Sequence, residues 1–166
     1  LEASAKTLIV DPTYTEETPG YGFDKFSSFA EALQAAAENT EVQVIKVAGD
    51  IDEEIMPTDV EFLVNQDVVI TADKPVSINL KNNGTSYDII LGANADASGS
   101  KITFDENISL TLNDRLIWAG YYGNNADVEI KGEVSASQWW NGADTTVKAG
   151  GKLSTTGEAL IFRRGA

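Results

Sequence analysis

The spacing of apolar residues along the chain predicts one helix, near the N-terminus. Residues 26–40, FSSFAEALQAAAENT, carry apolar side chains at helical intervals: Phe26, Phe29, Ala30, Leu33 and Ala37. Ser28 stands three residues before Glu31, which is the spacing of a capping box, and Asn39 is a suitable C-terminal stop. With a single apolar stripe, this helix is expected to lie against a larger body.

The segments on either side of the helix are typical of strands. TLIVDP, residues 7–12, is a short apolar run ended by Asp-Pro, and EVQVIKVAGDI, residues 41–51, is a longer one ended by Gly-Asp. We therefore predict a strand-helix-strand cap over residues 7–50. Residues 1–6 are set aside as a tag or signal remnant, or as a linker.

Residues 60–162 show no helical periodicity and consist of short β-prone runs separated by Gly, Asn, Asp and Ser, so we assign residues 51–166 to the main β domain. Two stretches repeat each other, NNADVEIKGEVSASQWW and NGADTTVKAGGKLSTTGEALIF. The bulky runs RLIW, SQWW and ALIF follow one another at intervals of 22 residues. Recurring trios of short strands are typical of a solenoid and not of a sandwich. We predict a mainly β fold: a right-handed parallel β-helix of three-strand coils, with about four or five rungs, and an N-terminal capping α-helix.

The adjacent tryptophans of SASQWWNGAD must point to opposite faces if this segment is a strand. Arg115 and Arg163 share the parity of Trp139, which predicts that Trp139 faces outward. The other parity predicts an internal aromatic ladder of Trp118, Trp140 and Phe162. The exposed stripe and the neighbouring loop form our candidate ligand-binding patch: Trp139, Tyr121, Tyr122, Ile117, Ile161 and Arg115. Alternatively, the loop folds over the stripe and closes it.

Composition narrows the classes of function. The chain has 26 acidic and 12 basic residues, a net charge of −14, and neither His nor Cys. This charge argues against a nucleic-acid partner, and the lack of Cys excludes disulfides and thiolate metal sites. No apolar run reaches the length of a membrane span, so membrane insertion is not expected. Ala3-Ser4-Ala5 matches the small-x-small pattern of signal-peptidase sites, a weak indication of secretion.

The abundant acids supply candidates for a Ca²⁺ site, the one cofactor considered. Asp127 and Asp144 occupy the same slot in successive repeats, and Asp50 and Asp52 lie in the run GDIDEE. The alternative interpretation is that these side chains cap turns. Further polar residues flank predicted turns and could hold a substrate, or could simply be solvated: Asp105, Glu106, Asn107, Asp114 and Arg115. No nucleophile or phosphate-loop motif is present, and no catalytic residue is assigned.

Four stretches of the chain carry a resemblance: the D-P strand of the opening segment, FSSFAEALQAA, VIKVAG and the coil VEIKGEVSASQWWNGADTTVKAGGKLSTTGEALIF. Together they resemble the pectin-lyase-like right-handed β-helix. The chain is similar in particular to β-helix regions of large secreted or wall-anchored proteins of gut Firmicutes. The resemblance implies an extracellular, bacterial cell-surface location and contact with glycans or with host or bacterial proteins. It predicts a non-catalytic module of an adhesin-like protein, acting as stalk or binding surface. The alternative is a fragment of a carbohydrate-active enzyme, a polysaccharide lyase or glycoside hydrolase.

The final residues, RRGA, match the lead-in to the earlier repeats and then stop. We therefore expect further coils of the same polypeptide beyond Ala166. The alternative is that the open strand edge serves end-to-end pairing or accepts a strand from a partner.

Overall fold

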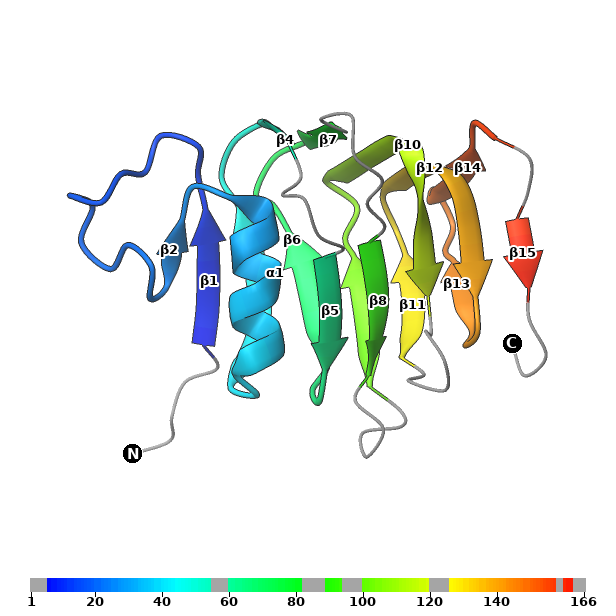
Figure 1. Ribbon diagram of the computed structural model, residues 1–166, viewed down its shortest axis with the longest axis horizontal. Helices are drawn as coiled ribbons and strands as arrows, with labels where there is room; N and C mark the ends of the chain where they lie inside the picture. Colours follow the sequence, from blue (N-terminus) through cyan, green and yellow to red (C-terminus); the bar gives the residue numbers. More distant parts are fainter. Residues whose placement is uncertain are drawn as a thin grey trace.

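The structure is a computed structural model that describes residues 6–54, 60–81, 89–93, 100–119, 126–157 and 160–162. Within these ranges, side chains are described except at 60, 93, 113–119, 141 and 160–162. The fold is mainly β, with parallel strand pairing throughout the described residues and one short helix. Strands β1 (Lys6–Val10) and β2 (Lys25–Phe26) lie at one end of the stack and β15 (Leu160–Phe162) lies at the other (Figure 1).

Seven strands form one sheet, and their spatial order runs from late to early in the sequence except at its end, where β2 lies outside β1. The order is β13 (Thr145–Val147), β11 (Asp127–Ile130), β9 (Lys101–Phe104), β6 (Val68–Thr71), β3 (Val42–Val47), β1 (Lys6–Val10) and β2 (Lys25–Phe26). Because β1 and β3 pair with each other and β3 pairs with β6, the strands of the predicted 7–50 cap belong to the main sheet. No break in this sheet coincides with the predicted boundary at residue 50.

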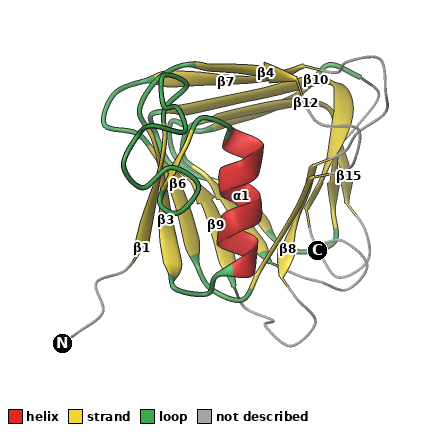
Figure 2. Cartoon of the chain, turned by 60° about the vertical axis from the view of Figure 1, so that its left-hand side comes forward, coloured by secondary structure: helices red, strands yellow, loops and turns green. Residues whose placement is uncertain are grey.

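The other strands form a second, branched sheet. Its main path is β14 (Lys152–Thr155), β12 (Glu133–Asn141), β10 (Ile108–Ala119), β7 (Val76–Lys81) and β4 (Ile51–Glu54). Three further strands complete it: β8 (Ile89–Ala93) pairs with the later half of β10, β5 (Val60–Val64) pairs with β8, and β15 (Leu160–Phe162) pairs with the later half of β12. Viewed obliquely along the stack, the strands lie on three sides of a common interior (Figure 2).

Equivalent strands stack in register, so that residues of successive passes form columns. On the seven-stranded sheet, one inner column is buried and apolar: Leu8, Ile45, Ile70, Phe104 and Ile130. On the second sheet, the equivalent column is Ile51, Ile78, Leu110 and Val134. These columns meet in one continuous hydrophobic core. Burial of apolar surface in such columns is the main stabilising contribution to the fold.

Helix α1 (Phe29–Glu38) confirms the predicted helix and its N-cap. The Ser28 hydroxyl accepts a hydrogen bond from the backbone N–H of Glu31, and Asn39 leaves the helical conformation with φ −133°. The buried face differs slightly from the predicted stripe and consists of Phe29, Ala32, Leu33 and Ala36. The helix packs chiefly along β5, on the side opposite the β8 pairing (Figure 1).

The expected spacing of the bulky runs holds for one interval and fails for the next. Ile117 pairs with Trp139, 22 residues later, but Trp139 pairs with Leu160, 21 residues later. The residue beside Ile161 is Trp140, and the residue beside Phe162 is Asn141. The interval is shorter still in the first half of β12, where Glu133 pairs with Lys152, 19 residues later.

Candidate functional site

An open groove runs across the corners where the chain passes from the seven-stranded sheet into the second sheet. Its volume is about 450 Å³, and its lining comes from five successive passes of the chain: Asp50, Pro75, Val76, Ser77, Glu106, Asn107, Ile108, Ser109, Gly132, Glu133 and Gly150. Parallel stacking places Asp50, Ser77, Ser109 and Glu133 side by side at one outward position. The groove is therefore a product of strand register and not of one local motif.

The polar groups of the groove are of two kinds. Some are engaged in the fold: the Asp50 carboxylate accepts from the Ser77 backbone N–H at 2.9 Å, and the Asn107 amide donates to the Ala72 carbonyl at 2.8 Å. Others are free: among the described residues, the exposed carboxylates of Glu106 and Glu133 make no side-chain hydrogen bond or ion pair. Within the described ranges, no Lys or Arg lines the groove. Unpaired acceptors on a concave surface suit a ligand rich in hydroxyl or amino groups.

Gly132 sets the floor of the groove. A Cβ atom at this position would collide with the backbone carbonyl oxygens of Ile108 and Asp105, on the preceding pass of the chain. Only glycine allows the two passes to approach this closely. The groove therefore depends on this close backbone contact at Gly132. The sequence shows a glycine after Lys131, but it does not show which part of the chain lies against it.

The prediction that Trp139 is exposed is wrong. Its side chain is fully buried, and its indole N–H donates to the Thr145 hydroxyl at 3.2 Å. Trp140, predicted as part of an internal ladder, is only half-buried, and its indole N–H donates to the Gln138 side chain at 2.8 Å.

The cause of this error is a change of parity within β12. Val134 and Ala136 are buried, so inward positions are even-numbered in the first half of the strand. The strand passes from one side of the core to the next around Ser137 and Gln138, and the next inward residue is Trp139. The pairing of β10 with β12 also shifts register between Leu112 and Leu116. Alternation with period two holds only along a straight strand.

The side chains of the remaining members of the predicted patch lie outside what the structure describes. Tyr121 and Tyr122 lie outside the described residues, as does Arg163. Arg115, Ile117 and Ile161 lie on strands, but their side chains are not among those described. By register, Ile117 stands beside Trp139 while Ile161 stands beside Trp140, so the predicted Ile-Trp-Ile column does not form.

The four Ca²⁺ candidates are distributed over three separate contacts. The Asp127 carboxylate accepts from the Asp144 backbone N–H at 3.3 Å, and Asp50 makes the contact to Ser77 described above. Asp52 forms an ion pair with Lys81 at 2.9 Å. Within the described residues, no three acidic side chains converge as metal ligands would. The capping interpretation describes Asp127 and Asp50, although each caps the next pass of the chain and not its own turn.

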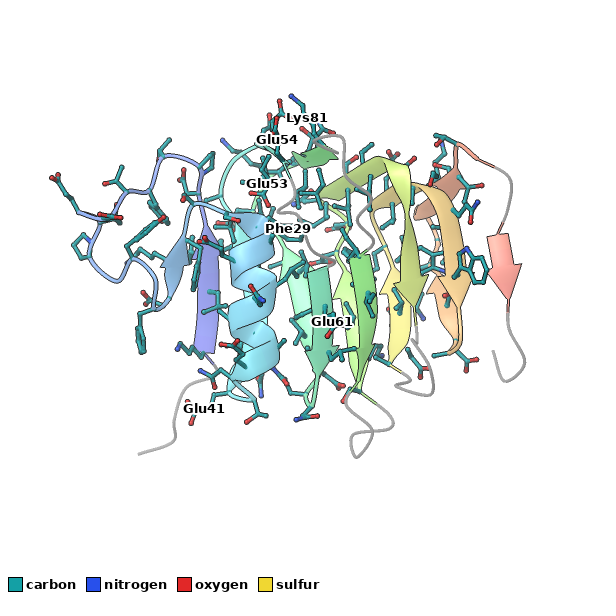
Figure 3. All side chains as sticks on the ribbon, viewed as in Figure 1. Phe29, Glu41, Glu53, Glu54, Glu61 and Lys81 are labelled. Atoms are coloured by element: carbon teal, nitrogen blue, oxygen red, sulfur yellow. The ribbon has the colours of Figure 1, made fainter. Side chains whose placement is uncertain are left out.

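The sequence did not single out the most unusual acid, Glu53. By register it continues the inner column of Leu80, Leu112 and Ala136, and its two carboxylate oxygens lie 3.0 Å from the backbone nitrogens of Phe29 and Ala30. Figure 3 shows Glu53 above the first turn of α1, beside Phe29. Burial raises the pKa of Glu53 despite the hydrogen bonds from Ala30 and Phe29, which lower it. The sequence offered one signal for this position: Glu53 is two residues after the apolar Ile51, so both side chains point to the same face of β4.

The opposite end of α1 is held by Gln66, which follows β5. Its side-chain nitrogen lies 3.0 Å from each of the backbone carbonyl oxygens of Ala36, Asn39 and Val42. Ala36 lies in the last turn of the helix and Asn39 is its C-cap, where carbonyl groups lack the partners of a continuing helix, whereas Val42 begins β3. Glu53 and Gln66 therefore attach the two ends of the helix to the segments before and after β5.

A second notable acid, Glu129, lies on the outer face of the seven-stranded sheet. Its carboxylate is 3.2 Å from Lys101 Nζ and 4.0 Å from the Nζ atoms of Lys131 and Lys148. The hydrogen bond from Lys101, with the charges of the three lysines, lowers the pKa of Glu129. This cluster is compensated internally and makes a poorer ligand site than the groove.

Comparison with known proteins finds no match: no family model, no curated protein and no solved structure. No helix among the described residues is long and apolar enough to span a membrane. The resemblance to pectin-lyase-like proteins therefore stays a prediction.

Proposed function

We propose that this chain is a non-catalytic, extracellular β-helix module of a bacterial cell-surface, adhesin-like protein that binds a glycan or a protein partner along the corner groove. The observation that carries the proposal is the groove itself, with the carboxylates of Glu106 and Glu133, which have no partner in the part of the chain that the structure describes. It replaces the aromatic patch, whose central residue, Trp139, is buried.

The order of the strands supports a parallel β-helix. After β3, the chain visits the same sides repeatedly: β3, β4, β5, then β6, β7, β8, with β10 and β12 each spanning two sides in later passes. These passes are consistent with about five rungs. We expect a right-handed winding, because crossovers between parallel strands are almost always right-handed.

The binding hypothesis is tested by glycan-array screening and calorimetric titration of the intact chain. Glu106→Gln/Glu133→Gln removes both free carboxylates and should reduce affinity for any ligand found by about tenfold or more. The matched control is Glu16→Gln/Glu17→Gln, which changes the net charge equally on an exposed loop. Equal affinities of the parent and the groove variant would refute the groove as the binding site.

The second candidate, a carbohydrate-active enzyme, rests on the presence of two carboxylates in one groove. Glycoside hydrolases use a pair of acids on either side of the scissile bond. Incubation with oligosaccharides, followed by product analysis, separates the two functions. Product formation that disappears in Glu106→Gln would favour the enzyme.

A further inference from the structure

The charge of the corner groove restricts the class of ligand. Within the described ranges its charged lining residues are all acidic: Asp50, Glu106 and Glu133. Gly132 brings the passes that carry Glu106 and Glu133 close together, because a Cβ atom there would collide with the Asp105 carbonyl oxygen. Like charges on adjacent passes repel each other, and a concave surface focuses their field. A cationic group in the groove relieves this repulsion, whereas an anionic group adds to it.

The lysines near the groove do not supply that cation. Lys131 and Lys148 lie 4.0 Å from the Glu129 carboxylate, on the outer face of the other sheet. Lys152 stands beside Glu133 by register, but it does not line the groove, and the two form no ion pair among the described residues. A cation in the groove therefore has to come from a bound molecule.

The face of the second sheet beside the groove carries short polar side chains. Strands β4 and β7 and the first parts of β10 and β12 form this side of the stack (Figure 2). Register places outward residues in two columns: Ser77, Ser109 and Glu133 in the first, and Asn79, Thr111 and Ser135 in the second. The first column also lines the groove, so the columns are continuous with it.

These columns form a regular lattice of hydroxyl groups. Neighbouring strands lie about 4.8 Å apart, and alternate residues along a strand lie about 6.6 Å apart. In the part of the chain that the structure describes, the hydroxyls of Ser109, Thr111 and Ser135 make no hydrogen bond. A hydroxyl group both donates and accepts, so the lattice matches a ligand that presents hydroxyl groups of its own.

We propose that the groove and the adjoining columns bind a linear glycan that carries free amino groups, an inference that rests on the proposed function. The ammonium groups of such a ligand lie against Glu106 and Glu133, where charge-assisted hydrogen bonds form. Its sugar hydroxyls lie over the serine and threonine columns. A basic peptide has the same charge but lacks the ring hydroxyls, so the columns favour the sugar.

The test compares three probes by calorimetric titration of the intact chain, in mildly acidic buffer that keeps amino groups protonated. The first is an oligomer of glucosamine. The second is the same oligomer with every amino group acetylated and therefore uncharged, and the third is an oligomer of lysine of matched charge. We expect the glucosamine oligomer to bind at least about tenfold more tightly than either of the others. Added salt should weaken its binding, because charge attraction is screened.

Two pairs of substitutions assign the effect to the groove and to the columns. Glu106→Gln/Glu133→Gln should abolish the preference for the free amine over the acetylated probe, whereas Glu16→Gln/Glu17→Gln, with the same change of charge on an exposed loop, should retain it. Ser109→Ala/Ser135→Ala changes two outward hydroxyls and should weaken binding of the glucosamine oligomer by about threefold to tenfold.

The outcomes separate this inference from the proposed function. Equal binding of the free and acetylated probes, or binding of the lysine oligomer as tight as that of the sugar, would overturn the amino-glycan assignment. The same is true if the preference survives in Glu106→Gln/Glu133→Gln. A neutral or acidic ligand whose binding depends on the groove would overturn the inference and leave the proposed function in place. If no ligand depends on the groove, both are refuted.

Discussion

Glu53 and Glu129 are both glutamates on parallel strands, and the two faces of the sheets surround them in opposite ways. Glu53 lies at an inner position, bound by two backbone N–H groups and by no cation among the described residues, and its pKa is raised. Glu129 lies on an outer face beneath three lysines, and its pKa is lowered. For these two glutamates, the face of the sheet on which the side chain lies determines the direction of the pKa shift.

The distribution of charge sharpens the comparison. Residues 1–99 contain 18 acidic and 5 basic residues, whereas residues 100–166 contain 8 and 7. Glu129 therefore has lysines on neighbouring passes of the chain, and Glu53 lies in a segment that has few cations. Charge repulsion in the first part is a cost that burial of the apolar columns must exceed.

The largest expected effect tests the inner and outer faces at two adjacent residues. Trp139→Ala should reduce the free energy of unfolding by about 3–5 kcal/mol, because it empties a fully buried site. Trp140→Ala, at a half-buried outer position, should cost about 1 kcal/mol. Urea denaturation of both variants measures the difference. Equal losses would mean that the two faces of β12 are not distinguished as described.

The next effect concerns the helix attachment. Glu53→Lys places a positive charge against the N–H groups of the first helical turn and should cost about 2–3 kcal/mol. Glu54→Lys, at the exposed neighbouring position, is the control and should change stability little. Chemical denaturation followed by circular dichroism measures both. A mild effect of Glu53→Lys would show that the carboxylate is not needed to hold α1.

The pH dependence of Glu129 should have the sign opposite to that of Glu53. Because its folded pKa is lowered, its contribution is present above its unfolded pKa and is lost as the pH falls through the folded pKa. The stability advantage of the parent over Glu129→Gln should therefore shrink as the pH falls below the ordinary pKa value of 4.5. Denaturation curves across this range provide the check, and an advantage that grows in acid would contradict the assignment.

The smallest effect is that of salt. The lysines around Glu129 have about half of their side-chain surface exposed, so their charges are accessible to screening. At about 1 M NaCl the Debye length is about 3 Å, and the pKa of Glu129 should move upward toward its ordinary value. The pKa of Glu53, set mainly by desolvation, should move less. Carboxyl NMR titrations at low and high salt compare the two shifts.

Part of the candidate site was visible in the sequence. The sequence predicts that Glu106 and Asn107 flank a turn and could hold a substrate, and the structure places both in the groove. The sequence gives no sign of Glu133 as a site residue, because only the register of β10 with β12 puts it beside Ser109. The free carboxylates of the groove come from residues far apart in the sequence, and local patterns do not report which passes of the chain are neighbours.

The sequence by itself determined the mainly β character, the single helix with its Ser28 cap, and the recurrence of strands that stack in parallel. These features arise from local propensity and from spacing over a few residues. Tertiary structure decided which tryptophan is buried, where β12 changes sides, and which carboxylate holds α1. A strand that crosses a corner shifts its inward parity by one residue, and this depends on how the passes pack around the common core.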